Sequence, residues 1–454
     1  MGNRSLTCGS VQIMPDIIAA RSQMAMSLGF HIIFAAIGMA MPLMMAIAEW
    51  HWLRTKDPVS LVLAKRWAKG TAILFAIGAV SGTVLSFELG LLWPTFMSWA
   101  GQSIGLLFAL EGFAFFAEAI FLGVYLHGWG RVSPHAHFAA GCVVAVSGVA
   151  SAVFVVTANA WMNTPRGFEL VSGRMIHIDP IAAMANPAAF GESLHMVLAA
   201  FAATGFAVAG VHAFLLLGDR QNLFHQRALR IALLVGGIPA ILQPLSGDLL
   251  TREVARYQPA KLAAFEALFH TQQGAPLTLG GVPDEQLQRT RYAIEIPKAL
   301  SVLLYYDPQA TVRGLDAFPR DQWPPVGIVH MAFQLMVAAG FVMTGIALWA
   351  GWRWWRHRTL ERSTWLLRAL ALATPLGFVA IEAGWVVTEV GRQPWIIYGV
   401  LRTSDAVTPM PGLIVPLITF TLLYVFLAAV VVWLLMNHIA ASPSFLPGRK
   451  VKGA

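Results

Sequence analysis

Hydrophobic residues along the chain fall into long runs that are separated by short polar segments. Nine runs reach the length of about 20 mostly apolar residues that a helix needs to cross a bilayer. These runs cover residues 23–50, 70–90, 103–127, 137–161, 192–217, 228–248, 325–351, 365–387 and 412–437. The pattern predicts an all-α integral membrane protein, a bundle of nine transmembrane helices.

One polar stretch between the sixth and seventh runs is far longer than the other connections. It divides the chain into an N-terminal segment, six helices, a long loop, three helices and a tail. The predicted boundaries are 1–22, 23–248, 249–324, 325–437 and 438–454.

Composition and charge support a membrane protein and set its orientation. The chain is 57% hydrophobic and 12% charged, whereas soluble domains carry about 25% charged residues. Outside the long loop, 17 lysines and arginines fall on one side of the predicted bundle and 6 on the other. Because basic residues stay in the cytoplasm, we expect the N-terminus and the long loop outside and the C-terminus in the cytoplasm. The net charge of +8 then reflects topology, and no nucleic-acid partner is expected.

Four residues with metal-ligating atoms lie within the apolar runs, toward their predicted outer ends. They are His31, His195, Met336 and Glu382. Imidazole nitrogen and thioether sulfur suit haem iron, and a His/Met pair is typical of a low-spin electron-transfer haem. Each residue also has a simpler interpretation, since a histidine can bond a neighbouring helix and a methionine can fill the core. A carboxylate in lipid needs a partner or a proton in either case.

Two further pairs of polar residues indicate proton chemistry. Glu111 and Glu118 are seven residues apart and therefore share one helical face. They form a line along which protons could pass inward, or they make two separate helix–helix hydrogen bonds. In the long loop, Lys261 and Glu266 could hold the oxygen atoms of a quinol headgroup and take its proton, or they could lie on a solvated face.

Several segments together resemble subunit I of the cytochrome bd-type quinol oxidases. The most specific are GRQPW at 391–395 and EAGW at 382–385. KLAAFEA at 261–267, EGFAFFAE at 111–118 and ANAWMNTP at 158–165 also match. The resemblance covers nearly the whole chain, and it implies nine helices with a quinol loop between the sixth and the seventh.

The resemblance implies ligand roles for the four residues in the apolar runs. His31 matches the axial ligand in the high-spin, oxygen-reacting haem region. Glu382 matches the carboxylate ligand of the other high-spin haem. His195 and Met336 match the two axial ligands of low-spin haem b. The implied cofactors are two haem b and one haem d, with haem b as the alternative at the third site.

The resemblance also assigns the remaining polar pairs. Lys261 and Glu266 match the quinol-oxidising pair, and Glu111 and Glu118 match carboxylates of the proton route and the haem environment. The resemblance also implies a membrane quinol and O2 as substrates.

Three residues concern the haem environment. Arg392 and Trp395 lie in the GRQPW segment beside the haems, where the arginine would meet a propionate by charge pairing. Gln334 stands two residues before Met336, where many members have arginine, so a positive charge near the low-spin haem is missing. This departure and the short quinol loop resemble the cyanide-insensitive branch.

The implied function is the haem-bearing catalytic subunit of a terminal oxidase in the bacterial cytoplasmic (inner) membrane. It would oxidise quinol at the periplasmic side, reduce O2 to water with cytoplasmic protons, and generate a proton motive force without pumping. The implied protein partners are a second membrane subunit and a small single-helix subunit, within the lipid bilayer.

Three rival functions fit the residues less well. A dihaem cytochrome b needs paired histidines about 13 residues apart on shared helices, and His195 and His212 are 17 apart. A haem–copper oxidase needs an adjacent His–His pair, which the sequence lacks. A proton-coupled transporter without haem would show inverted repeats, which are not seen, and would leave Met336 unexplained.

Overall fold

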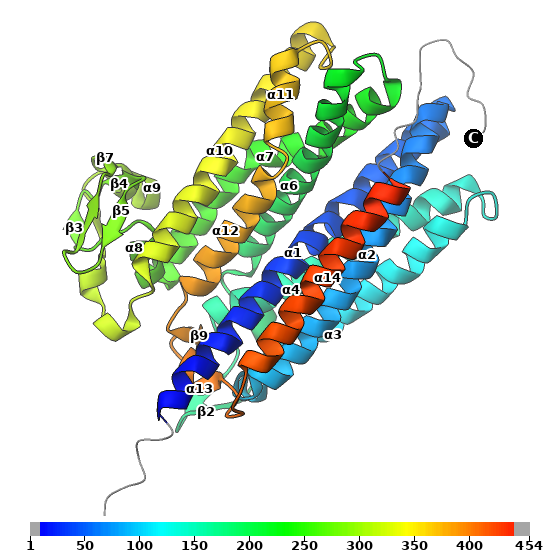
Figure 1. The fold of residues 1–454 in the computed structure, drawn as a ribbon. Coiled ribbons are helices and arrows are strands. Elements are labelled where there is room, and N and C mark those ends of the chain that lie inside the picture. Colours follow the sequence, from blue (N-terminus) through cyan, green and yellow to red (C-terminus); the bar gives the residue numbers. More distant parts are fainter. Residues whose placement is uncertain (1–9, 440–454) are drawn as a thin grey trace, which may run out of the picture.

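The computed structural model describes residues 10–439 and consists mainly of long helices (Figure 1). Within these residues nine helical segments are long and apolar enough to cross a membrane, which confirms the predicted fold class. They are α1 (Ser10–Thr55), α2 (Pro58–Leu92), α3 (Pro94–His127), α4 (Pro134–Asn163), α6 (Ala189–Gly218), α7 (Leu223–Tyr257), α10 (Val326–His357), α11 (Thr364–Leu372) joined with α12 (Leu376–Val390), and α14 (Ile414–His438).

Most helices extend beyond the apolar runs that predict them. The helix predicted from residue 70 begins at Pro58, and the one predicted to end at 248 continues to Tyr257. The added turns carry polar residues, which can continue a helix where it leaves the hydrocarbon. Asp57 caps the earlier start of α2 by accepting from the backbone N–H of Val59 at 3.1 Å, as is typical of an N-cap carboxylate.

The eighth predicted helix is interrupted. Its two halves, α11 and α12, meet around Pro375. Proline lacks the backbone N–H and its ring clashes with the carbonyl four residues earlier, so the helix ends before it and restarts after it. The hydroxyl of Thr374 donates to the carbonyl of Ala371 at 2.7 Å and satisfies one of the exposed backbone groups at the break.

Short elements lie in the connections. The helices are α5 (Pro180–Met184), α8 (Pro259–Phe265), α9 (Ala299–Tyr305), α13 (Thr403–Ala406), η1 (Leu315–Ala317) and η2 (Arg320–Gln322). The strands are β1 (Glu169–Val171), β2 (Arg174–Ile176), β3 (Gln272–Gln273), β4 (Leu277–Leu279), β5 (Val282–Asp284), β6 (Arg289–Arg291), β7 (Ile294–Ile296), β8 (Thr311–Val312), β9 (Trp395–Ile397) and β10 (Leu401–Arg402). They form antiparallel pairs β1–β2, β3–β8, β4–β7, β5–β6 and β9–β10.

The two ends of the bundle differ in their connections. We call the end with the three long connections, residues 164–188, 258–325 and 391–413, the loop end; α1 begins there (Figure 1). The opposite end has only brief turns between helices, and we call it the short-turn end. Residues 1–9 of the N-terminal segment and 440–454 of the tail lie outside the described residues, as do Arg4, Arg449, Lys450 and Lys452 of the charge comparison, whereas residues 10–22 belong to α1.

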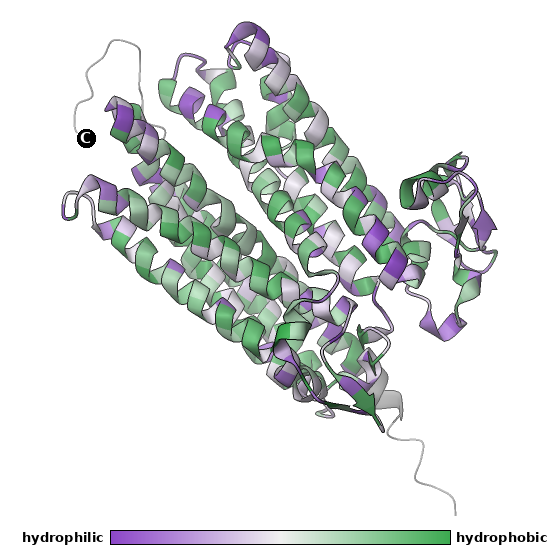
Figure 2. Ribbon diagram, turned by 180° about the vertical axis from the view of Figure 1, so that it is seen from behind, coloured by the Kyte–Doolittle hydropathy of each residue, from purple (hydrophilic) through white to green (hydrophobic). Residues whose placement is uncertain are grey.

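The helices pack in two groups (Figure 1). One contains α1 to α4 with α14, and the other contains α6, α7, α10, α11 and α12. Contacts of α6 with α1 and α4 join the groups. Hydrophobic residues cover most of the helix lengths, while hydrophilic residues gather at the ends and in the connections (Figure 2), as a bilayer requires.

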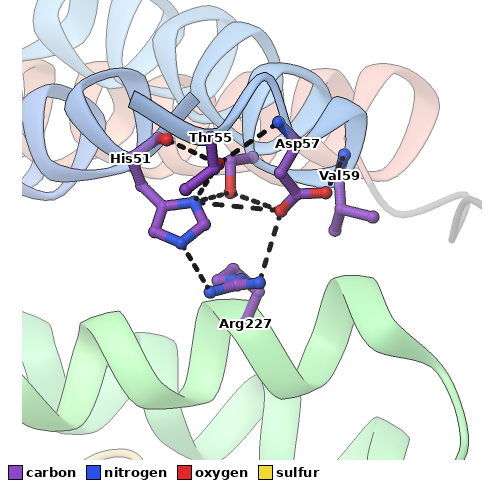
Figure 3. A network of polar contacts seen from close by, with 6 residues as sticks. His51, Thr55, Asp57, Val59 and Arg227 are labelled. Atoms are coloured by element: carbon purple, nitrogen blue, oxygen red, sulfur yellow. Dashed lines mark hydrogen bonds and ion pairs between the residues drawn. The ribbon is translucent and has the colours of Figure 1, made fainter. Parts of the chain in front are cut away.

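A polar network at the short-turn end joins the two groups (Figure 3). Arg227 at the start of α7 pairs with Asp57 at 3.3 Å and lies 3.0 Å from Nε2 of His51 on α1. The Thr55 hydroxyl donates to the backbone carbonyl of His51 at 2.7 Å. The turn between α1 and α2 is thereby attached to the second group.

Candidate functional site

A first cavity of about 400 Å³ lies in the second helix group, toward the loop end. Its walls contain His195 of α6, Met336 and Gln334 of α10, Lys261 of α8 and Glu266 just after α8. Five residues that the sequence places on three separate segments thus meet at one site. The volume falls in the range typical of small-molecule sites, and most of the lining is apolar.

A second cavity of about 670 Å³ lies mainly in the first group. His31 of α1, Glu111 and Glu118 of α3, and Arg392 all line it. The two cavities share part of their walls. The residues common to both are Val156, Asn159, Met196 and Trp385. A single layer of side chains therefore separates the two predicted ligand sites.

The imidazole of His195 is held in one tautomer by α7. Ser246 Oγ donates to the backbone carbonyl of Gln243 at 2.9 Å, so it accepts from Nδ1–H of His195, also at 2.9 Å. The lone pair then sits on Nε2, where the Gln243 amide nitrogen lies 3.1 Å away. A histidine that ligates a metal through one nitrogen typically donates its other N–H in this way.

His31 is held by the same arrangement on a different helix. Ser81 Oγ of α2 donates to the carbonyl of Gly78 at 3.1 Å and lies 3.0 Å from Nδ1 of His31. The ring packs directly against α2, since a methyl group added at Gly82 would lie 2.9 Å from Cε1. Within the described chain, Nε2 of His31 has no hydrogen-bond partner, and this residue lines the second cavity.

Other buried histidines have protein partners on both ring nitrogens. His330 bonds the carbonyls of Phe265 at 2.8 Å and Gly280 at 3.0 Å, and His137 bonds Glu49 and the carbonyl of Tyr125. These two are satisfied by the fold. His31 differs because its Nε2 has no hydrogen-bond partner among the described residues. Nε2 of His195 meets only the amide of Gln243, and the ring lines the first cavity.

Two predicted site residues lie outside both cavities. Glu382 faces α1, since a methyl group added at Gly29 would lie 3.1 Å from its Oε2. Its Oε1 is buried without a hydrogen bond in the described part of the chain. Trp395 lies in β9 with the guanidinium of Arg402 over its ring at 5.2 Å. The fourth ligand candidate, Met336, packs next to Gly384 of α12, where an added methyl group would lie 3.1 Å from the sulfur.

Lys261 and Glu266 are both buried, at 3% and 1% exposure. Lys261 Nζ donates to Oδ1 of Asn163 at 3.0 Å. Burial lowers the pKa of Lys261 to about 7, with a further lowering from the positive charge of Arg392. Burial raises the pKa of Glu266 to about 8, which the backbone of Thr278 opposes only in part. Both groups can therefore exchange protons near neutral pH.

The helix-3 carboxylates face α4 and α1. Ser151 Oγ donates to Oε1 of Glu111 at 3.2 Å. Glu118 packs against the backbone of α4, where a methyl group added at Gly148 would lie 3.2 Å from Oε1. Both carboxylates line the same cavity, as their shared helical face predicts.

A match to known sequences now decides the family. Residues 19–443 match the family described as cytochrome bd terminal oxidase subunit I. The chain belongs to this family.

Individual relatives agree with the family match. The chain is 39% identical to the putative cytochrome bd menaquinol oxidase subunit I of Bacillus subtilis, over 95% of this chain and 98% of that protein. It is 32% identical to the cytochrome bd ubiquinol oxidase subunit 1 of the same organism, over 94% of each. The bd oxidase of Geobacillus thermodenitrificans has a similar structure, with a TM-score of 0.87 at 39% identity, covering 94% of this chain and 99% of that one.

As a member of the bd oxidase subunit I family, the chain is a multi-pass membrane protein and part of a quinol oxidase, a haem enzyme. This assignment confirms the resemblance and excludes the transporter, dihaem cytochrome b and haem–copper alternatives.

Gln334 has a contact that the sequence did not suggest. Its Nε2 donates to the carbonyl of Thr278 at 3.0 Å, and its Oε1 accepts from the N–H of Gly280 at 2.9 Å. In this bd oxidase subunit, Gln334 therefore holds the loop around β4 against the first cavity, together with His330. The same side chain lines that cavity two residues from Met336.

A buried polar network lies at the loop end and was not predicted from the sequence. Oδ1 of Asn163 accepts from Lys261, from Arg392 Nη1 at 3.1 Å and from Gln258 at 3.3 Å, and its amide donates to Glu192 at 2.7 Å. Asn163 and its neighbour in the network, Asn159, both lie in the ANAWMNTP segment. Asn159 inside the apolar run and Asn163 just after it were a usable signal, because polar side chains in a membrane helix need partners.

A carboxylate completes this network. Glu389 accepts from the amide of Asn159 and forms a close ion pair with Arg392. Arg392 is almost fully buried, so its charge needs this partner. Glu389 also lines the second cavity.

Proposed function

We propose that this chain is the haem-bearing catalytic subunit of a bacterial terminal oxidase that oxidises membrane quinol and reduces O2 to water. One observation carries the proposal. His31 and His195 are each held through Nδ1 by a serine whose own proton goes to a backbone carbonyl, and both line a cavity. The two cavities share a wall, so groups bound in them would lie close together.

The residues fit haem in type and placement. His195 and Met336, on opposing helices of the first cavity, would hold a low-spin haem b. His31 would hold a high-spin haem in the second cavity, where the buried guanidinium of Arg392 suits a propionate. When bound, the haems would carry electrons from quinol and supply the iron that binds O2. The proposed set is two haem b and one haem d, with haem b as the alternative at the third site.

Lys261 and Glu266 would bind and deprotonate the quinol. Both line the first cavity beside the proposed haem ligands. The ammonium of Lys261 can donate to a quinol oxygen, and the carboxylate of Glu266 can accept a hydroxyl proton. The buried carboxyl of Glu266 lacks a side-chain partner in the described part of the chain, so it is available to the substrate.

Glu111 and Glu118 would carry protons toward the second cavity from the short-turn end. Their seven-residue spacing places them about 10 Å apart along α3. The hydroxyl of Ser151 donates to Glu111, the one nearer the loop end. Protons taken up there and protons released from quinol at the loop end would separate charge across the membrane without a pump.

Charge and surface support a proposed orientation and proposed partners. We place the loop end in the periplasm and the short-turn end in the cytoplasm of a bacterial inner membrane, because the basic residues gather at the short-turn end. Large apolar side chains on α3 and α14, among them Phe113, Phe116 and Trp433, are exposed. Such faces suit lipid or the second and small membrane subunits.

The carboxylate ligand of the other high-spin haem has two candidates. Glu382 remains the prediction from the sequence, and its Oε1 is unpartnered. Glu389 lines the cavity itself. The two are seven residues apart on one face of α12, so only their depth differs. We expect Glu→Gln at the true ligand to alter the high-spin bands of the reduced-minus-oxidised spectrum while the low-spin band stays. Glu389→Gln also removes the ion-pair partner of the buried Arg392, so Glu382→Gln is the deciding variant, and it should leave both sets of bands unchanged if Glu389 is the ligand. If neither variant changes the high-spin bands, both assignments are wrong.

Quinol-driven O2 consumption in proteoliposomes tests the proposed function. The assembled oxidase should consume O2 on addition of a reduced quinol and should release protons on the side of the loop end. Absence of O2 consumption by haem-loaded protein would contradict the proposal, and proton release on the other side would contradict the orientation.

A further inference from the structure

A second buried acid–base pair lies at the short-turn end, away from both cavities. Nδ1 of His137, near the start of α4, is 2.7 Å from Oε1 of Glu49 on α1. Their side chains are 3% and 0% exposed. Nε2 of His137 is 2.9 Å from the backbone carbonyl of Tyr125 on α3. None of the functions described above uses this pair.

The geometry leaves one proton to be shared. A carbonyl only accepts, so Nε2 of His137 must carry a hydrogen. The proton between Nδ1 and Oε1 can then sit on either atom, as imidazolium–carboxylate or as imidazole–carboxylic acid. Oε2 of Glu49 and the hydroxyl of Tyr125 are both buried without a regular hydrogen bond in the described residues, although they lie close enough to interact electrostatically. The pair can therefore take up and release a proton without a rearrangement of the backbone.

The pair lies in line with the two carboxylates of the proposed proton path. Glu111, Glu118 and Tyr125 are spaced at intervals of seven on α3, so one helical face presents all three. Residues of the antiparallel helix α4 face these three residues in reverse sequence order. Ser151 contacts Glu111, Gly148 packs on Glu118, and a methyl group added at Gly141 would lie 2.7 Å from the ring of Tyr125.

Helix α1 packs against the same contact line between α3 and α4. A methyl group added at Gly38 of α1 would lie 3.8 Å from Oε1 of Glu118, and Glu49 lies three turns further toward the short-turn end. The next polar group along this contact line after Glu118, toward the short-turn end, is therefore the Glu49–His137 pair, about 10 Å away along α3. Buried apolar residues, among them Leu122 and Val144, fill this interval, so transient water has to bridge it.

His137 is also close to the aqueous surface. It is the fourth residue of α4, which begins after the exposed Ser133. The indole of Trp129 covers its ring, with ring centroids 3.9 Å apart, and Lys65 lies over that indole at 5.5 Å. One aromatic side chain thus separates the imidazole from the short-turn surface.

We propose that His137 and Glu49 form the proton-uptake pair that supplies Glu118 and Glu111. A proton from water adds to the His137–Glu49 pair, and the pair passes a proton from Glu49 through water to Glu118. This release returns the pair to one shared proton, ready to take up the next one. This inference rests on the proposed function, since it supplies the protons that O2 reduction consumes.

Glu49→Gln tests the pair, because the amide keeps the shape but cannot carry the proton. In the assembled oxidase we expect the haem spectrum and anaerobic reduction by quinol to stay at wild-type level. O2 consumption and proton uptake from the short-turn side should fall together by about tenfold or more. Glu49→Asp should restore part of the rate. The matched control is Glu88→Gln, since Glu88 is a buried glutamate at the loop end that accepts from Gln23 at 2.9 Å; it should stay within twofold of wild type.

Two outcomes would overturn the inference. One is a Glu49→Gln oxidase whose turnover and proton uptake match wild type. The other is loss of assembled haem in both Glu49→Gln and His137→Gln, which would show that the pair only supports the fold. If wild type itself lacks haem or quinol oxidation, the proposed function fails instead, so the two failures are distinguishable.

Discussion

Replacing Met336 with leucine is expected to abolish the low-spin haem signal and to lower quinol-driven O2 consumption by more than about 100-fold, because even groups behind a metal ligand contribute 10–100-fold. Leucine has nearly the volume of methionine, so the fold should be retained. It lacks the thioether sulfur, which is the only atom of this side chain that can bind iron. The measurement is the reduced-minus-oxidised spectrum of the purified variant together with its oxygen uptake.

Met343 offers a matched control for this substitution. It lies seven residues further along α10, is buried, and lines the same cavity. Met343→Leu should keep both the spectrum and most of the activity. The ligand assignment fails if Met336→Leu keeps a wild-type low-spin band, or if Met343→Leu loses it.

The second large effect is expected at the quinol site. Glu266→Gln and Lys261→Met should each lower quinol oxidation by about 100-fold or more, the contribution typical of a positioned acid or base. Haem content and reduction by dithionite should not change, because neither residue is a proposed ligand. Glu295→Gln and Lys298→Met alter exposed residues of the same loop and should stay near wild-type rates. Equal losses in these controls would point to a general effect on the loop.

The pH dependence of quinol oxidation separates the two roles. Glu266, with its pKa raised to about 8 by burial, gains its base form as the pH rises through that value. Lys261, with its pKa lowered to about 7, loses its proton-donating form as the pH rises through that value. Wild type should therefore show a narrow maximum between the two. Glu266→Gln should lose the acid-side limb and Lys261→Met the alkaline-side limb; unchanged limbs in both variants would contradict the assignment.

Long apolar runs were enough to predict the fold, because a bilayer allows few alternatives to a helix bundle. Helix ends were less predictable. Polar residues between Pro58 and residue 69, and again between 249 and Tyr257, continue the helices where water or protein replaces lipid. The break at Pro375 was underestimated, since proline in a membrane helix is often tolerated.

The site could be predicted as a set of residue types but not in its detail. Ser81 and Ser246, which orient the two histidines, are invisible in the sequence because they lie on neighbouring helices 50 and 51 residues away. Glu382 and Glu389 share one helical face, so periodicity cannot say which of them reaches the cavity. The packing of α12 decides this: Glu382 lies against α1, while Glu389 meets Asn159 of α4 and lines the cavity.

The reduced-minus-oxidised spectrum of the purified wild-type complex, followed by a pyridine haemochrome assay, tests the central claim most directly. We expect a low-spin haem b band, high-spin bands from the second cavity, and haem b in the haemochrome, with haem d or further haem b at the third site. Purified, folded protein without haem bands would contradict it, because His31, His195 and Met336 would then have no iron to bind.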